Sequence, residues 1–323
     1  MRATLPHDDY ARRCAPPRFG DNPRVRHSHV PTRAVLLISS AVLCFTVLDA
    51  ITKFMTQRYP VPVLVFARYA VQFVAMVMWL GPTMRLGLVR TNRLRVQAFR
   101  GILLLASSLF FVNALRSLPL AEATALNYST PIIVVLLGRV VLGERLTQSR
   151  IAFVVVGVAG MLLIVQPGSD MFRGGVLFGL GAAVFYGCYQ ITTRMLAGED
   201  PRVLLFYPAL IGTFVMSVLA PGFAWPPSMP WTHMLLIVCG GLFGTVGHFL
   251  FILAFRLAPA SALTPFTYMQ LVWAMLLGWL LYGNFPDAYR IAGMIVIAAS
   301  GLWMTLHERR RARLVALDPV TVQ

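Results

Sequence analysis

Charged side chains are scarce in this sequence, where they make up 12% of 323 residues. Soluble globular domains are about 25% charged and about 45–50% apolar, whereas 58% of this chain is hydrophobic and its mean hydropathy is +0.71. A soluble fold of this length has no place for so much apolar surface. At about 20 residues per bilayer crossing, the apolar content allows on the order of ten helical spans. The composition therefore excludes a soluble enzyme and predicts an all-α integral membrane protein.

Lysine is almost absent, since 27 of the 28 cationic residues are arginine and the exception is Lys53. The formal net charge of +16 could indicate a nucleic-acid partner, but the arginines cluster in short loops between apolar runs. That distribution orients membrane helices, because positive loops stay in the cytoplasm. We therefore expect a lipid bilayer around this chain and no nucleic acid. The preference for arginine is typical of a GC-rich bacterium, so the expected location is the cell inner membrane.

Cysteine and catalytic motifs are also lacking. The four cysteines lie far apart, without a C-x-x-C pair or metal-ligand spacing, so we expect neither disulfides nor a metal site. No G-x-S-x-G, Walker A loop or His-Glu-x-x-His occurs. No loop is large enough for a nucleotide-binding domain. These absences argue against an enzyme, a cofactor and an ATP-driven pump.

Ten apolar runs, separated by Pro, Gly or Arg, predict ten spans with boundary errors of a few residues. They cover residues 34–55, 61–82, 101–118, 120–142, 149–166, 174–195, 203–220, 234–255, 260–282 and 289–306. The basic segment 1–33 is expected to be a disordered cytoplasmic tail, and 308–323 a second basic cytoplasmic tail. With both termini in the cytoplasm, 21 basic residues fall on that side and 4 on the other, as the positive-inside rule requires. Lys53, Arg68 and Arg139 remain inside spans, and Arg139 is close enough to the cytoplasmic end to snorkel in a structural role.

The chain also repeats itself after 140 residues without gaps. Roughly 14 of the 46 positions from 114 to 159 are identical to their shifted counterparts, among them Arg116 and Arg256, Pro119 and Pro259. Residues 34–168 and 174–307 would each hold five spans. Because five is odd, the second copy must enter the membrane from the opposite side. Such an inverted repeat is typical of secondary transporters, and the alternative is a duplicated scaffold without a transport role.

The segment from Ala114 through Glu122 to Thr147 resembles the junction of the third and fourth spans in EamA-type proteins of the drug/metabolite transporter superfamily. Asp49-x-x-x-Lys53, Phe66-Ala67-Arg68 and Gln166-Pro167-Gly168 are also similar to that family. The second copy is a weaker match, with Gly283-Asn284 where the family often has Gly-Glu. The resemblance covers about residues 34 to 307. It implies a ten-helix carrier that works by alternating access, and it does not identify the substrate.

Four ionisable residues are expected in one layer near the outer surface. Asp49, Lys53, Arg68 and Glu122 lie at similar depth in the assigned topology, and each is costly inside a bilayer. Two acids and two bases at one depth can neutralise each other. Their shifted counterparts are Tyr189, Thr193, Pro208 and Ala262, so the charged layer would exist on one half only. That asymmetry favours an outer gate or a coupling site, and a static salt-bridge cluster is the alternative. Glu122, with fewer cationic neighbours in sequence than Asp49, is the expected protonatable group.

A second set of residues predicts a substrate cavity between the halves. Pro131 and Pro265 would kink spans four and nine and free backbone carbonyls, which need partners at membrane depth. Polar and aromatic residues nearby could supply them: Asn113, Asn127, Tyr128, Tyr189, Gln190, His248, Tyr268, Gln270 and Trp273. These groups suit a substrate with a planar or apolar part and several hydrogen-bonding groups. The alternative is a pair of kinked helices whose hydrogen bonds are satisfied by neighbouring helices.

The predicted function is a secondary carrier for small organic metabolites or drugs, with export preferred and proton coupling allowed. The first alternative is an uptake carrier, for example for a vitamin. The alternative of another class is a membrane-embedded enzyme acting on lipid-linked substrates, for which no cluster of acids, histidines or metal ligands is found. A homodimer is an additional expectation for the partners.

Overall fold

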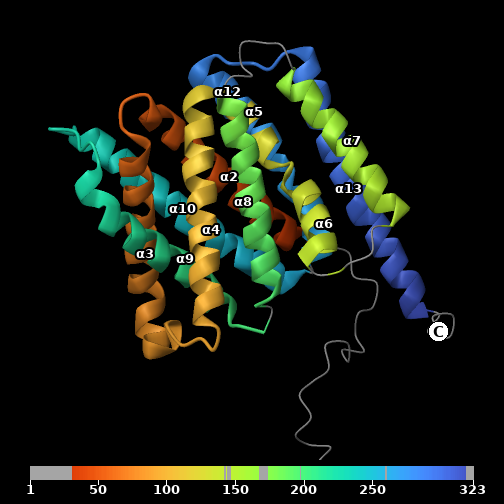
Figure 1. Ribbon diagram of the computed structural model, residues 1–323, viewed down its shortest axis with the longest axis horizontal. Coiled ribbons are helices and arrows are strands. Elements are labelled where there is room, and N and C mark those ends of the chain that lie inside the picture. Colours follow the sequence, from red (N-terminus) through yellow and green to blue (C-terminus); the bar gives the residue numbers. More distant parts are fainter. Residues whose placement is uncertain are drawn as a thin grey trace, which may run out of the picture.

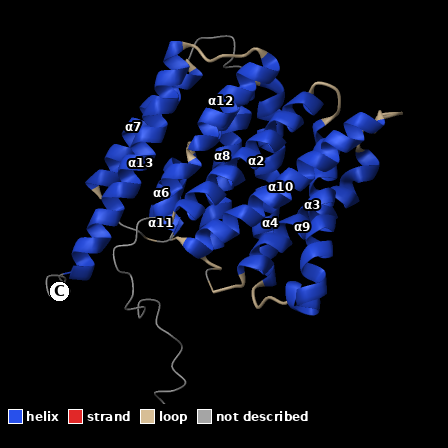
Figure 2. Cartoon of the chain, turned by 180° about the vertical axis from the view of Figure 1, so that it is seen from behind, coloured by secondary structure: helices blue, strands red, loops and turns tan. Residues whose placement is uncertain are grey.

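The computed structural model describes residues 31–141, 143, 147–166, 174–196, 198–258 and 260–317, and these form a bundle of helices without a β-strand (Figures 1 and 2). In chain order the helices are α2 (Thr32–Thr56), α3 (Val61–Met84), α4 (Leu94–Ser117), α5 (Leu120–Asn127), α6 (Thr130–Val141), α7 (Gln148–Val165), α8 (Gly175–Arg194), α9 (Pro201–Leu219), α10 (Trp231–Leu257), α11 (Ala260–Thr267), α12 (Met269–Tyr282) and α13 (Ala288–Leu317). Short 3-10 turns, η1 (Arg85–Leu88) and η3 (Ala220–Gly222), follow α3 and α9. The all-helical architecture expected from composition is confirmed.

Within the described residues, nine helical segments are long and apolar enough to cross a membrane. They correspond to all the expected spans except 260–282, which is divided between α11 and α12. One expected boundary is wrong. The third span begins at Leu94 rather than at 101, so Arg100 lies inside α4 and not in the preceding loop. A buried arginine is tolerated there because neighbouring helices supply hydrogen-bond acceptors.

Two helices are interrupted close to a proline. Pro131 has no N–H, so the carbonyl of Asn127 receives no backbone donor from it, and the Thr130 hydroxyl donates to that carbonyl at 2.6 Å. The chain accordingly divides into α5 and α6 at this point. In the second half, α11 contains Pro265 and ends at Thr267, directly before α12.

The two halves have the same succession of helices at the 140-residue spacing. The short helices α5 (Leu120–Asn127) and α11 (Ala260–Thr267) differ by this spacing at both ends. The glycines that follow α6 and α12 are also equivalent, because Gly143 and Gly283 share a left-handed backbone with φ of +67°. A glycine adopts this conformation without the strain that a Cβ would introduce. The repeat in the sequence is therefore also a repeat of local structure.

The halves exchange packing partners. The third helix of the first half, α4, packs against α8 of the second, and α10 packs in turn against α2. The packing of α10 on the first half depends on small residues: a Cβ on Gly241 would lie 2.5 Å from Val71, and one on Gly247 would lie 2.8 Å from Phe45. These glycines therefore allow α10 to approach the first half closely.

The equivalent helices α7 and α13 lie side by side at one edge of the bundle (Figures 1 and 2). Ser149, near the start of α7, lies 2.8 Å from His307 in α13, whereas Gln166, just after α7, lies 3.1 Å from Asp287, just before α13. The two helices therefore run antiparallel. Between these ends they approach closely, because a Cβ on Gly293 would lie 2.6 Å from the Gly160 carbonyl oxygen.

Candidate functional site

The two helix interruptions meet in the middle of the bundle. Tyr128, directly after α5, and Tyr268, directly after α11, place their rings 5.1 Å apart. The Tyr128 hydroxyl donates to the Thr267 carbonyl at 2.5 Å and lies 3.2 Å from Oε1 of Gln270. The Thr267 carbonyl, at the interruption between α11 and α12, thus accepts a hydrogen bond from Tyr128, at the interruption between α5 and α6. We call Asn127, Tyr128, Tyr268, Gln270 and Trp273 the central cluster.

The central cluster contacts Asp49 of α2. Nε2 of Gln270 donates to Oδ2 of Asp49 at 3.4 Å, while Oε1 of the same amide faces Tyr128. Two further polar atoms of the cluster, Oδ1 of Asn127 and Nε1 of Trp273, are buried without a hydrogen-bond partner. Buried polar groups are normally satisfied. One acceptor and one donor of the cluster are therefore unpaired within the described chain.

The charged residues expected in one layer do not pair with one another. Nζ of Lys53 donates to the carbonyls of Leu115 and Leu118 at the end of α4, at 3.0 Å and 2.6 Å. These carbonyls attract a cation because the end of a helix leaves them without backbone donors. No close ion pair therefore joins these four residues in the described chain, although Lys53 lies within electrostatic range of Glu122 and Arg68 within range of Asp49.

Glu122 pairs instead with a residue of the second half. Its Oε1 lies 3.2 Å from Nη1 of Arg290, and Oδ2 of Asp287 lies 3.4 Å from the same nitrogen. The expectation that Glu122 has fewer cationic neighbours than Asp49 is wrong, because Asp49 has no ion pair in the described chain. Asp287 also accepts from the backbone N–H of Arg290, and this hydrogen bond holds the pKa of Asp287 below its usual range. We call the end of the bundle that holds these residues the Glu122 end.

Arg68 and His248 lie near each other in the interior. Arg68 is half-buried in α3, and it makes no hydrogen bond or ion pair with the described residues. It lies within electrostatic range of Asp49 and His248. The His248 ring packs edge-on against Phe45, with the ring centroids 4.9 Å apart.

A buried cation that was not predicted from the sequence lies at the opposite end of the bundle. Arg100 is 1% exposed, and its Nη1 donates to Oη of Tyr189 and Oγ1 of Thr193, both at 3.2 Å. Tyr189 and Thr193 are the repeat equivalents of Asp49 and Lys53. These positions of the second half carry no charge of their own, and α4 of the first half brings the Arg100 cation to two of them. We call this end, where α8 ends and α4 and α9 begin, the Arg100 end.

A signal for this cation was present in the sequence. Gln97, Arg100, Ser107 and Ser108 are all buried in α4, and they follow one another at helical spacing. The row extends the buried face of the span beyond the apolar run that begins at 101. Arg290 was missed for a different reason, since its partner Glu122 is distant in sequence.

Other expected cavity residues do not join the central cluster through hydrogen bonds. Nδ2 of Asn113 donates within its own helix, to the Leu109 carbonyl at 2.8 Å. Gln190 is half-buried in α8 and makes no hydrogen bond to the described residues, and Tyr189 belongs to the Arg100 end. Arg139 is exposed near the end of α6.

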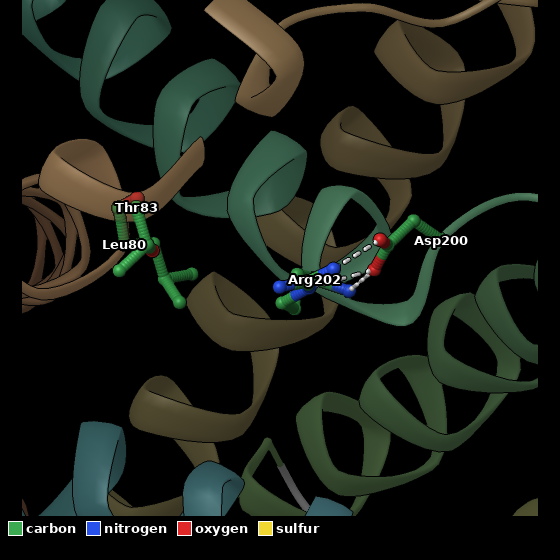
Figure 3. Close-up of polar contacts among 4 residues, drawn as sticks. All are labelled: Leu80, Thr83, Asp200 and Arg202. Atoms are coloured by element: carbon green, nitrogen blue, oxygen red, sulfur yellow. Dashed lines mark hydrogen bonds and ion pairs between the residues drawn. The ribbon is translucent and has the colours of Figure 1, made fainter. Parts of the chain in front are cut away.

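A hollow of about 400 Å³ lies at the Arg100 end, between the α3–α4 and α8–α9 connections. It is lined by Met84, Gly87, Arg90, Thr91, Asn92, Gly198, Glu199, Asp200 and Val203. Asp200 begins α9 by accepting from the backbone N–H of Arg202 at 2.8 Å, and its carboxylate also faces the Arg202 guanidinium (Figure 3). The hydrogen bond from the Arg202 side chain holds the pKa of Asp200 below its usual range. The hollow therefore lies at a junction of two connections, and the Asp200 carboxylate in its lining is already paired with Arg202.

Comparisons with known proteins agree on one family. The model of the EamA-like transporter family matches residues 32–166 and 173–306. A riboflavin transporter of Rhizobium johnstonii is 29% identical over 293 residues, which cover 88% of this chain and 95% of that protein. An S-adenosylmethionine uptake transporter of Rickettsia bellii is 25% identical over 223 residues, which cover 69% of this chain and 76% of that protein. One crystal structure shares the fold, with a TM-score of 0.60 and 22% identity over 86% of this chain and 98% of that one.

These matches confirm the resemblance stated from the motifs. The relatives are transporters and not enzymes, and the apolar helices make this chain a multi-pass membrane protein. Because the two matched stretches together span most of the sequence, the chain belongs to the EamA-like transporter family.

Proposed function

We propose that this protein is a secondary carrier that takes up a flat, nitrogen-containing heteroaromatic metabolite by alternating access. Riboflavin and S-adenosylmethionine, named for two relatives, both contain such a ring system. Planar ligands stack on aromatic side chains while polar groups fix their orientation. In this chain, that combination occurs in the central cluster.

The observation that carries the proposal is the meeting of the two interruptions at Tyr128 and Tyr268. Discontinuous helices of secondary transporters place irregular backbone at the substrate site, near the interface of the two repeats. Here the rings of both copies lie 5.1 Å apart. The unpaired Nε1 of Trp273 and Oδ1 of Asn127 would bind an acceptor and a donor of the substrate.

The proposed architecture has ten spans built as two inverted five-span copies, with the family domains at 34–168 and 174–307. The two separate matches of the family model support this division. The antiparallel pairing of the equivalent helices α7 and α13 supports the inversion, since equivalent helices of parallel repeats would run in the same direction. In this proposal α11 and α12 together form the ninth span, interrupted in the same way as α5 and α6.

Uptake now replaces export as the preferred direction. The sequence alone favoured export, but the Rickettsia bellii relative is named an uptake transporter, and the other named relative transports a vitamin, riboflavin. Asp49, Lys53, Arg68 and Glu122 are proposed as gate or coupling residues. Glu122 links the halves through Arg290, which supports a gate at the Glu122 end.

The orientation follows from the positive-inside rule. We propose an inner-membrane location with both termini in the cytoplasm, so that the Glu122 end faces outward and the Arg100 end faces the cytoplasm. The homodimer stays a prediction, to be tested by the mass of the purified protein in detergent.

Uptake by cells and by reconstituted protein tests the function. A riboflavin auxotroph that expresses this protein should grow at external riboflavin concentrations that do not support the parent strain. Liposomes that contain only the purified protein should accumulate labelled riboflavin or S-adenosylmethionine, recovered chemically unchanged. Tyr268→Ala should abolish this flux, whereas Tyr289→Ala, at an exposed position of α13, should preserve it. A folded protein that moves neither compound would overturn the proposed substrate class.

A further inference from the structure

Arg100 is a buried cation without a counter-ion. It is the largest side chain of the described core that is almost fully inaccessible. Its acceptors are all neutral: Tyr189, Thr193, the side chain of Gln97 at 3.1 Å and the carbonyl of Leu204. No carboxylate of the described chain forms an ion pair with it. Arginine does not lose its proton in proteins, so the charge persists, and an uncompensated buried charge is costly.

Two hydrogen-bond donors at this place have no partner. They are Nε of Arg100 and Nε2 of Gln97, and both atoms are buried. The orientation of the Gln97 amide is fixed, because a guanidinium has donors only and must face the amide oxygen. The NH₂ group of Gln97 therefore has to point elsewhere. A full positive charge and two free donors on neighbouring turns of one helix form a site that is complete only when an acceptor, best a negatively charged one, is added.

Two stacked tyrosines lie beside this site. The Arg100 guanidinium lies over the Tyr189 ring at 5.1 Å from its centroid, and the Tyr189 and Tyr186 rings stack at 5.6 Å. Aromatic faces therefore lie next to the guanidinium, and a planar ligand has stacking partners there.

We propose that Arg100 and Gln97 bind an oxyanion group, a carboxylate or a phosphate, of the transported metabolite on the cytoplasmic half of its path. This inference adds a charge preference to the proposed function and rests on it for the identity of the transported substrate. It predicts that, among heteroaromatic compounds, this carrier prefers those that carry an anionic group. A neutral heteroaromatic compound would leave the two donors unsatisfied and be carried less well.

Anion binding is tested first without any assumption about the cargo. The probes are sodium acetate and sodium phosphate, added to the full-length protein in detergent, with sodium chloride of equal ionic strength as the reference. We expect acetate or phosphate to raise the unfolding temperature of the wild-type protein by roughly 2–4 °C, since a ligand that binds only the folded state stabilises it. Gln97→Glu should abolish this rise without loss of folding, because the new carboxylate would pair with Arg100 and repel an anion.

Thr193→Val is the matched control. It removes one acceptor of Arg100 but leaves the charge and both free donors in place, so the response to acetate or phosphate should remain. Equal responses of the wild-type protein and Gln97→Glu, or a wild-type protein that responds to chloride as strongly as to the oxyanions, would overturn the proposal.

Transport measurements then test whether the anion site contacts the transported substrate. Reconstituted wild-type protein should prefer S-adenosylmethionine over its decarboxylated analogue by about tenfold, the ratio that one charge-assisted contact of about 1.4 kcal/mol provides. In Gln97→Glu the ratio should fall to about one. An unchanged ratio in Gln97→Glu overturns the site as a substrate contact. If the anion response depends on Gln97 but neither compound is transported, the proposed substrate class fails and the anion site stands.

Discussion

The Glu122 carboxylate lies 3.2 Å from the Arg290 guanidinium, and this ion pair joins α5 of the first half to α13 of the second. Glu122 is 2% exposed. A buried ion pair that connects two halves of a carrier must break when they separate. Its partner Arg290 also contacts Asp287, so the cation would keep one acid if Glu122 became protonated. This arrangement allows Glu122 to exchange a proton while the half-buried Arg290 keeps an acidic neighbour.

Glu122→Gln should therefore abolish accumulation that is driven by a pH gradient, while exchange of labelled for unlabelled substrate continues. The amide retains the shape of the side chain but cannot carry a proton through the cycle. Asp287→Asn is the matched control, because it removes the other acid at Arg290 and should leave the response to the gradient intact. The measurement is substrate accumulation in liposomes with an imposed pH difference. A full response in Glu122→Gln would show that another group couples transport, and facilitated diffusion would then be the better model.

Trp273→Phe should weaken substrate binding several-fold without lowering the thermal stability of the protein. Nε1 of Trp273 has no partner among the described residues, so its removal costs no internal hydrogen bond and relieves an unsatisfied donor. The substitution should therefore lower the affinity for the substrate and leave the stability of the folded protein unchanged. Dissociation constants from fluorescence titration and unfolding temperatures of the same preparations separate the two effects. A large loss of stability with unchanged affinity would remove Trp273 from the site.

Gly293→Ala should destabilise the protein by about 1–3 kcal/mol, the usual cost of overpacking. Its Cβ would lie 2.6 Å from the Gly160 carbonyl oxygen, and backbone cannot move aside as a side chain does. Gly81→Ala is the control, since the nearest atom there would lie at 3.9 Å, an ordinary contact. Thermal unfolding in detergent compares the two variants, and equal unfolding temperatures would contradict the close approach of α7 and α13.

Asp200 should make stability depend on pH in the acidic range. Its hydrogen bond from Arg202 lowers the pKa of the folded state below the ordinary value of 3.8, so the stabilisation is fully present above about pH 4 and is lost as the pH falls through the folded pKa. Asp200→Asn keeps an acceptor for the backbone N–H of Arg202 but has no charge to titrate. The difference in unfolding temperature between the wild-type protein and this variant should shrink between about pH 6 and about pH 3. A constant difference would mean that the charge contributes nothing.

Reporters should establish the topology. A reporter after Arg93 and another after Arg313 should both be cytoplasmic, and one inserted near Pro227 should lie outside. Alkaline phosphatase and fluorescent protein fusions give opposite signals on the two sides. A cytoplasmic signal near Pro227 would contradict both the ten-span arrangement and the inversion of the second copy.

Local properties of the chain made most of the fold predictable. Apolar runs located the helices within a few residues, and Pro131 and Pro265 marked where two of them are interrupted. The predicted boundary is wrong at α4, because a charged residue before the apolar run indicates a loop, whereas Arg100 has acceptors in α8 and α9. The partners of Lys53 and Glu122 were wrong for the same reason: the Leu118 carbonyl and Arg290 are brought near by tertiary packing, which sequence separation does not reveal.

The exchanged packing of the halves has a consequence for biosynthesis. While the first half leaves the ribosome, α2 and α4 have not yet met their main partners, since α10 and α8 are made later. The membrane must therefore hold several helices loosely associated, with Lys53 and Arg100 already inside, until the second half is inserted. Assembly of this carrier is a late event that depends on the whole chain, and a product that stops after α7 would expose polar side chains to lipid and become a substrate for membrane quality control.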